Sequence, residues 1–246
     1  MCGKDHGAEL LMLLMPTQAF ILVGGRGTRL GSLVDRTPKP MLKVGEKPFL
    51  DYVIGWLQKN GITQVILLAG YLGKEIENYY FNKNLNIDLK VIVEDSPLGT
   101  GGSIFSVIEM MKDNFLVCNG DSICPFNFKN LKAANIQGST LFLSKEKNPI
   151  RYGVIGHKNG KVIKFNEKKS MRGIFDINTG VYALNKKDFI DYGVSPSSLE
   201  IDFLPQLVSN GILYCEEVNK DLLDIGIPED YNRAGDFLKQ NNLLEF

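Results

Sequence analysis

The sequence predicts an α/β fold, in which a mainly parallel mixed sheet is covered by helices on both faces. In the first half of the chain, apolar segments of strand length alternate with segments whose apolar residues recur at helical spacing. The apolar segments, such as Val65-Ile66-Leu67-Leu68-Ala69, are continuous. Continuous apolar strands are typical of a parallel sheet that is buried on both faces.

The first half contains the clearest elements. We expect strands at residues 19–23, 64–69, 89–93 and 115–118, and helices at residues 48–60, 74–80 and 102–111. In the helix from Pro48 to Asn60, proline suits the first turn and Gly61 suits the C-terminal cap. Its apolar residues fall at helical spacing: Leu50, Val53, Ile54 and Leu57.

The second half has shorter connections and a different character. We expect strands at residues 141–144, 153–156, 161–165 and 180–184, and helices at residues 199–209 and 229–240. The charged stretch 145–148 is interpreted as a solvated turn. Because the chain has no repeat, low-complexity tract or linker, residues 16–246 are predicted to form one domain with a cleft between its halves. Residues 1–15 are interpreted as an N-terminal extension.

Charge and composition exclude several classes of protein. The 28 basic and 28 acidic residues among 246 cancel, which argues against binding to nucleic acid or to a membrane surface. The run Leu10–Met15 is too short to span a membrane. Four cysteines without paired spacing and two histidines predict reduced thiols in a cytoplasmic protein, with no zinc site. The sequence leaves open whether the chain forms a homo-oligomer.

A glycine-rich loop, Gly24-Gly25-Arg26-Gly27-Thr28-Arg29-Leu30, directly follows the first strand. Its glycines allow close backbone approach to an anion, and the Arg29 guanidinium suits phosphate oxygens. The loop is not a dinucleotide motif, because Leu30 occupies the position of the last glycine. It is not a P-loop either, because no Gly-Lys-Ser/Thr follows. Taken alone, it could also be an ordinary turn with a surface arginine.

Three further segments carry polar groups at loop positions. Pro38-Lys39-Pro40 holds a lysine in a stiff turn, and residues 94–102 (EDSPLGTGG) join a strand to a helix. Asn119-Gly120-Asp121 follows the strand at residues 115–118, where a carboxylate can hold Mg²⁺ at the sheet edge. Each segment alone also has an ordinary structural explanation.

Together these motifs resemble a known family. From about Gln18 to Tyr231 the chain is similar to the sugar-1-phosphate nucleotidylyltransferases, which share a three-layer, glycosyltransferase-A-like fold. The resemblance rests on six motifs in order: GGRGTRL, PKP, EDSPLGTGG, NGD, FNEK (residues 165–168) and DIGIPEDY (residues 224–231). It implies an enzyme that joins a nucleoside triphosphate to a sugar 1-phosphate and releases pyrophosphate.

The resemblance also implies roles for individual residues. The expected nucleotide-binding residues are Gly24, Gly25, Gly27, Thr28, Arg29, Gly99, Thr100 and Gly101. The expected catalytic residues are Arg29, Lys39, Asp121 and Lys168, with Lys168 near the sugar phosphate. The expected sugar-binding residues are Gly153, Glu167 and Asn178. Asp121 and Asp224 are expected to hold Mg²⁺.

Departures from the common motifs of the family indicate which of its branches the sequence most resembles. Gly31-Ser32-Leu33-Val34 follows the first motif where Pro-Leu-Thr is frequent, Ile227 replaces a frequent threonine, and no hexapeptide-repeat domain precedes Phe246. With PLGTGG and Arg151-Tyr152-Gly153, the sequence most resembles D-glycero-D-manno-heptose 1-phosphate guanylyltransferases. Mannose 1-phosphate with GTP, or another sugar with UTP or CTP, remains an alternative. A non-catalytic regulatory paralogue is disfavoured, because the motif positions are chemically intact.

The implied reaction explains why the motifs contain no histidine that could act as a general base. A phosphate monoester has a second pKa of about 6, so its oxygen is already ionised near neutral pH and needs no general base. Positive charge from Arg29, Lys39, Lys168 and a metal ion would offset the two anions that react. Asp121 and Asp224 each follow an apolar segment, residues 115–118 and 222–223. We therefore expect them at neighbouring parallel strands of one sheet.

Overall fold

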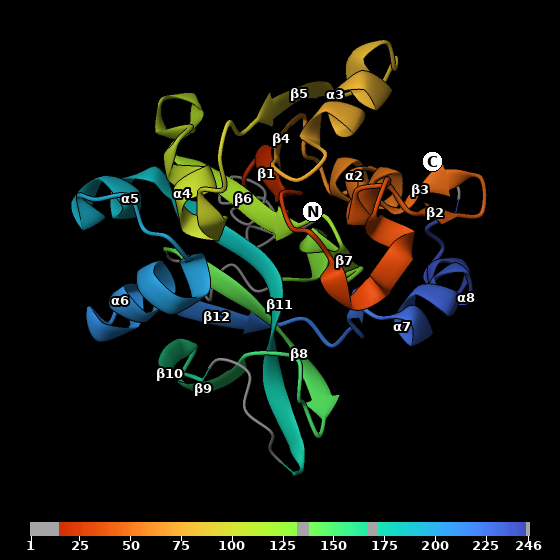
Figure 1. Cartoon of the computed structure of the whole chain (residues 1–246). Helices are drawn as coiled ribbons and strands as arrows, with labels where there is room; N and C mark the ends of the chain where they lie inside the picture. Colours follow the sequence, from red (N-terminus) through yellow and green to blue (C-terminus); the bar gives the residue numbers. More distant parts are fainter. Residues whose placement is uncertain (1–14, 132–137, 167–171, 245–246) are drawn as a thin grey trace, which may run out of the picture.

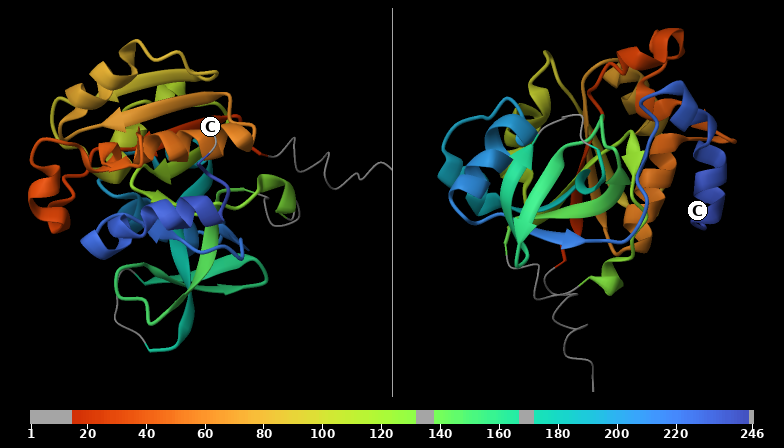
Figure 2. Two further views of the ribbon diagram at one scale, coloured as in Figure 1. Left: turned by 90° about the vertical axis from the view of Figure 1, so that its right-hand side faces the viewer. Right: turned by 90° about the horizontal axis from the view of Figure 1, so that it is seen from below.

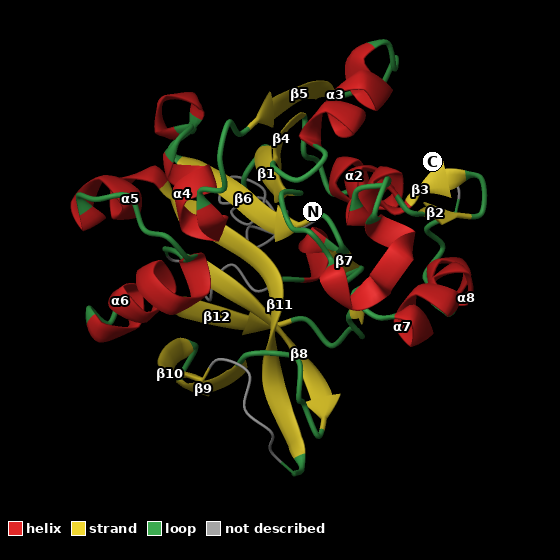
Figure 3. Cartoon of the chain, in the orientation of Figure 1, coloured by secondary structure: helices red, strands yellow, loops and turns green. Residues whose placement is uncertain are grey.

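The computed structural model of the chain describes residues 15–131, 138–166 and 172–244, in which helices cover both faces of one large mixed sheet (Figures 1 and 3). The order of the described strands is β5-β4-β1-β6-β11-β8-β12-β10-β9. This arrangement confirms the predicted three-layer α/β fold. The predicted N-terminal extension lies outside the described residues except for Met15.

The first half of the chain forms the parallel part of the sheet. Its strands are β1 (Gln18–Leu22), β4 (Gln64–Ala69), β5 (Asp88–Val93) and β6 (Asn114–Asn119). Successive residues of β1 point to opposite faces, so that Ile21 and Phe20 enter two different cores. Burying each such side chain stabilises the fold by about 1.5–3 kcal/mol.

The helices divide between the two faces. One face is covered by α2 (Phe49–Lys59), α3 (Gly73–Phe81) and α8 (Ala234–Gln240), with α7 (Pro228–Asn232) beside them. The other face carries α4 (Gly99–Phe105), α5 (Lys186–Tyr192) and α6 (Leu204–Ser209). Figure 1 shows these two groups of helices on either side of the sheet. No helix of the described residues has the length and apolar character needed to cross a membrane.

The second half forms a mostly antiparallel extension of the sheet. It contains β8 (Thr140–Lys147), β9 (Val154–Lys158), β10 (Lys161–Asn166), β11 (Ile174–Asn185) and β12 (Tyr214–Glu217). The long strand β11 lies antiparallel to β6 and joins the two halves. Because β9 pairs with both β10 and β11, these five strands form a closed ring of pairings. Figure 2 (left) shows the green to teal strands below the parallel half.

Several boundaries differ from the sequence prediction. The helix predicted at residues 102–111 begins at Gly99 and ends at Phe105, followed by a 3₁₀ turn at Ile108–Met110. The helix predicted at residues 229–240 divides at Arg233 into α7 and α8. The segment predicted as helix 199–209 begins with a π-helical turn, Leu199–Phe203, before α6. Helix α5 and strand β12 were not predicted.

The charged stretch 145–148 is not a solvated turn, as the sequence suggested. Strand β8 continues through Lys147, and only Asn148, at φ +51°, turns the chain. The strand continues because Lys145 has cross-strand partners: its Nζ lies 2.8 Å from Asp176 Oδ1 and 3.0 Å from Glu217 Oε2. Partners distant in sequence therefore override the local polarity of this segment.

His157 completes this polar cluster on the ring of strands. Its Nε2 lies 3.1 Å from Asp176 Oδ2 and 3.9 Å from Glu217 Oε1. Three such groups can hold a metal ion, but Lys145 already lies against both carboxylates, and its ammonium offsets one of their two negative charges. The cluster is therefore explained as an ion-pair network that joins β8, β9, β11 and β12.

This network predicts how stability depends on pH. Burial alone would raise the pKa of Asp176, but hydrogen bonds from Lys145 and His157 outweigh it and lower that pKa. A lowered folded-state pKa contributes stability that is present above the unfolded value of about 3.9 and is lost as the pH falls through the folded value. Because Lys145 is half-exposed, we expect Asp176→Asn to lower the free energy of unfolding at pH 6 by only about 0.5–1 kcal/mol.

Urea denaturation of both proteins from pH 7 to pH 3 measures this difference. The difference should shrink as the pH falls below about 4. A difference that grows below about pH 4 would contradict the assignment.

Candidate active site

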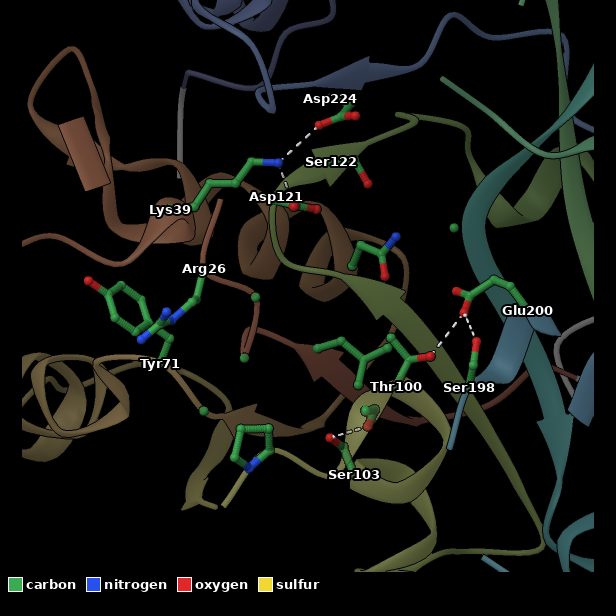
Figure 4. A pocket seen from close by; sticks show the side chains of 18 of the residues that line it. Arg26, Lys39, Tyr71, Thr100, Ser103, Asp121, Ser122, Ser198, Glu200 and Asp224 are labelled. Atoms are coloured by element: carbon green, nitrogen blue, oxygen red, sulfur yellow. Dashed lines mark hydrogen bonds and ion pairs between the residues drawn. The ribbon is translucent and has the colours of Figure 1, made fainter. Parts of the chain in front are cut away.

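A pocket of about 850 Å³ opens where the parallel strands β1, β4, β5 and β6 end. Its opposite wall comes from β11 and from residues 197–201. Figure 4 shows a charged group at the top of this pocket, and Thr100, Ser198 and Glu200 on the right. The position agrees with the rule that ligands bind outside the carboxyl ends of strands in open α/β sheets.

The charged group consists of one lysine between two carboxylates. Lys39 is only 5% exposed, and its Nζ lies 2.6 Å from Asp121 Oδ2 and 3.2 Å from Asp224 Oδ1. The backbone N–H of Gly226 also donates to Asp224 Oδ1, at 2.7 Å. A buried charge is costly unless it is paired, so these three side chains stabilise one another.

The structure brings the two aspartates together in a different way from the one predicted. Asp224 does not end a parallel neighbour of β6. It belongs to β13 (Leu223–Asp224), which pairs antiparallel with β7 (Ser122–Ile123) in a separate small sheet, with Asp224 opposite Ser122. The Ile225 N–H donates to the Asp121 carbonyl at 3.0 Å and fixes this register. The prediction failed because two-residue strands have no periodic sequence signal.

Some residues of the glycine-rich loop line the pocket and others do not. Gly24, Gly25 and Arg29 line the pocket, whereas Gly27 and Thr28 do not. Gly27, at φ +66°, packs on Lys39, and a Cβ there would lie 3.1 Å from the lysine side chain. Gly27 therefore leaves room for the buried lysine.

The first residues of α4 also differ in whether they line the pocket. Gly99 and Thr100 line the pocket, but the Gly101 N–H donates to the Ser197 carbonyl at 3.3 Å. A Cβ on Gly101 would lie 2.7 Å from the Pro196 carbonyl oxygen. The glycine at position 101 is therefore explained by close packing of α4 on the opposite wall.

On the predicted sugar side, Gly153 and Asn178 line the pocket. Glu167 and Lys168 lie outside the described residues. Of the three cysteines that the structure describes, none lines the pocket, and burial raises the pKa of Cys215 to about 12. These buried thiols are poor nucleophiles.

Besides Asp95, four charged residues of the pocket were not singled out from the sequence. Arg26 stacks on the Tyr71 ring, 5.1 Å from its centroid, at the lower left of Figure 4. The carboxylate of Glu94 accepts hydrogen bonds from the Ser103 hydroxyl and from the Leu98 N–H, the latter at 3.3 Å. The other two, Arg151 and Glu200, come from the second half of the chain.

Arg151 is held by a salt bridge to Asp230 of α7 and by its own neighbour Tyr152. Burial lowers the pKa of its guanidinium, but Tyr152, Asp230 and Asp224 together raise it. Glu94 and Arg151 belonged to quoted motifs, so an inventory of charged motif residues would have found them. Glu200 had no comparable signal, because two of its three partners, Thr100 and Tyr182, are distant in sequence.

The pocket therefore combines three features. Arg29 and Lys39 supply positive charge, two carboxylates converge on one cationic group, and a wide wall carries hydroxyl and amide groups. Cations suit phosphate oxygens, and paired carboxylates suit a divalent metal ion that bridges phosphates. Such a site is suited to phosphoryl or nucleotidyl transfer.

Comparison with known proteins agrees with this chemistry. The family model described as nucleotidyl transferase matches residues 18–241. The chain is 37% identical over 222 residues to D-glycero-alpha-D-manno-heptose 1-phosphate guanylyltransferase of Aneurinibacillus thermoaerophilus, covering 88% of this chain and 96% of that protein. It is 33% identical to the mannose-1-phosphate guanylyltransferase catalytic subunit beta of Dictyostelium discoideum, covering 87% of this chain and 62% of that protein.

The fold is also similar to a solved structure. HddC from Yersinia pseudotuberculosis complexed with GMP-PN superposes with a TM-score of 0.77 at 32% identity, covering 90% of this chain and 99% of that one. These findings confirm the resemblance inferred from the motifs. The chain belongs to the nucleotidyl transferase family, and it is a sugar-1-phosphate nucleotidylyltransferase.

Proposed function

We propose that this enzyme transfers a guanylyl group from GTP to D-glycero-α-D-manno-heptose 1-phosphate and releases pyrophosphate. The observation that carries the proposal is the 37% identity, over nearly the whole of both chains, to a guanylyltransferase of that specificity. A pocket with phosphate-binding cations at the ends of the parallel strands supports it. Mannose 1-phosphate is the second candidate, because a relative of that specificity is 33% identical.

Glu94 supports the choice of guanine. Guanine presents two adjacent donors, N1–H and the exocyclic amino group, and a carboxylate can accept from both. Glu94 lines the pocket, and each of its oxygens accepts one protein hydrogen bond, which leaves a lone pair on each. Uracil and thymine offer only one such donor, so a carboxylate there would favour GTP.

The reaction itself requires charge neutralisation and alignment. In the proposed mechanism, Arg29 and Lys39 bind the triphosphate, and Lys168 binds the sugar phosphate. Gly153, Glu167 and Asn178 bind the sugar hydroxyls. The ionised sugar phosphate attacks the α-phosphorus in line with the departing pyrophosphate, without a general base.

We propose Mg²⁺ as the cofactor, held by Asp121 and Asp224. The donor set fits this ion, because Mg²⁺ binds one or two carboxylates together with phosphate oxygens and water. The two carboxylates already converge on one cationic group, the Lys39 ammonium. When bound, the metal would neutralise phosphate charge. Lys39 could then contribute its charge to the triphosphate.

A substrate screen tests the choice of base and sugar. Pyrophosphate release should be measured with GTP, ATP, UTP and CTP against heptose, mannose and glucose 1-phosphates. GTP with the heptose phosphate should give the highest kcat/KM. UTP outperforming GTP by tenfold, a gap of about 1.4 kcal/mol, would overturn the guanine assignment.

The metal assignment predicts the effect of removing each carboxylate. Asp121→Asn and Asp224→Asn should each lower kcat by about a hundredfold or more, and the double variant should be scarcely worse, because residues that act as one unit are non-additive. Rates measured against Mg²⁺ concentration should show weaker metal dependence in both single variants. A normal Mg²⁺ response in Asp224→Asn, with lowered thermal stability, would reduce Asp224 to a turn-capping residue.

The close packing around Gly226 predicts that kcat depends on the geometry of the charged group as well as on its charges. A Cβ there would lie 2.7 Å from Asp224 Oδ1, 2.9 Å from Lys39 Nζ and 3.3 Å from Arg29 Nη2. These atoms end flexible side chains and can move, so Gly226→Ala should keep the fold but lower kcat by about tenfold or more.

Gly235→Ala is the matched control, because its nearest heavy atom would be 3.9 Å away. It should retain wild-type kinetics and melting temperature. Full activity in Gly226→Ala would show that the reaction does not depend on this arrangement.

A further inference from the structure

Glu200 accepts hydrogen bonds from both sides of the pocket. Its Oε2 accepts from the hydroxyls of Thr100, at 2.9 Å, and Ser198, at 3.2 Å (Figure 4). Its Oε1 accepts from the Tyr182 hydroxyl at 3.3 Å. Thr100 belongs to the predicted nucleotide loop, whereas Tyr182 contacts Asn178 of the predicted sugar side. One carboxylate therefore connects the two proposed substrate regions.

The directions of the hydrogen bonds on the sugar side are fixed by a backbone donor. The Gly180 N–H can only donate, and it bonds Asn178 Oδ1 at 2.9 Å. The amide nitrogen of Asn178 must then face the Tyr182 oxygen, to which it donates at 2.7 Å. The Tyr182 oxygen accepts this bond, so its own proton points to Glu200.

The same reasoning applies to the nucleotide side. The Leu199 N–H donates to the Thr100 hydroxyl oxygen at 2.9 Å, so the Thr100 proton is directed to Glu200. The Ile201 N–H donates to the Ser198 hydroxyl oxygen at 3.1 Å, with the same consequence for Ser198. The three hydroxyl protons thus point to both oxygens of Glu200, and a carboxylate offers two accepting oxygens whereas an amide offers one.

We propose that Glu200 is a positioning residue that holds the sugar side of the pocket in register with the nucleotide loop. Together with the Gly180 N–H, it holds the Asn178 amide in one orientation through Tyr182, with the remaining N–H and lone pair of Asn178 at the pocket wall. The inference rests on the proposed function, because it takes Asn178 as a sugar-binding residue.

Steady-state kinetics with GTP and heptose 1-phosphate test this role. Glu200→Gln should raise the KM for the sugar phosphate by about tenfold, as expected for loss of a hydrogen bond to a charged group. The KM for GTP should change less than about twofold. Tyr182→Phe removes the hydrogen bonds that join Glu200 to Asn178 and should reproduce the sugar KM effect. The double variant should be scarcely worse, because the residues form one network.

Asp202→Asn is the matched control. Asp202 accepts hydrogen bonds from the N–H groups of Ser197 and Ser198, at 3.0 and 2.8 Å. It therefore holds the segment 197–201, to which Glu200 belongs, but it does not line the pocket. It should leave the sugar KM within twofold of wild type. If Asp202→Asn and Glu200→Gln raised both KM values equally, Glu200 would only anchor this segment and the proposal would be wrong.

An unchanged KM for the sugar phosphate in Glu200→Gln or in Tyr182→Phe would also overturn the inference about Glu200. The proposed function would still stand if the wild-type enzyme turns over GTP with heptose 1-phosphate. A wild-type enzyme that turns over no sugar 1-phosphate with GTP would contradict both.

Discussion

The buried ammonium of Lys39 is the constraint on which the rest of the site depends. An isolated charge at 5% exposure would be strongly destabilising, so two carboxylates must be brought to it from distant parts of the chain. Asp121 arrives at the end of β6, and Asp224 arrives through the pairing of β13 with β7. Gly27 and Gly226 then leave the space that this arrangement needs. Residues of four motifs thus meet at one charged group.

The two halves of the sheet contribute different residues to the pocket around Lys39, Asp121 and Asp224. The parallel half ends in the glycine loop and Glu94, which face the proposed nucleotide region. The antiparallel half contributes Asn178 through the long strand β11, which pairs directly with β6. Because β11 belongs to the same sheet as β1, β4, β5 and β6, the sheet itself holds the proposed sugar wall beside the proposed nucleotide region. Glu200 and the Arg151–Asp230 salt bridge link the remaining segments to this frame.

The sequence predicted those helices and strands that depend on the spacing of nearby apolar residues. Strand β4 was predicted with its observed bounds, and α2 to within one residue, because continuous apolar runs and helical spacing are sequence signals. The pairing of β7 with β13, and the extension of β8 through Lys147, depend on partners far along the chain. Ten predicted site residues line one pocket, namely Gly24, Gly25, Arg29, Lys39, Gly99, Thr100, Asp121, Gly153, Asn178 and Asp224. Glu200 escaped prediction, because only the folded chain brings its three hydroxyl donors together.

We propose that the carboxylates that flank Lys39 also hold the metal ion during the reaction. An anomalous diffraction map of crystals grown with Mn²⁺, as a substitute for Mg²⁺, and a non-hydrolysable GTP analogue tests this role. We expect one strong peak coordinated by Asp121, Asp224 and phosphate oxygens, with Lys39 turned toward the triphosphate. A peak remote from both aspartates, with Lys39 still bridging them beside the bound nucleotide, would contradict it.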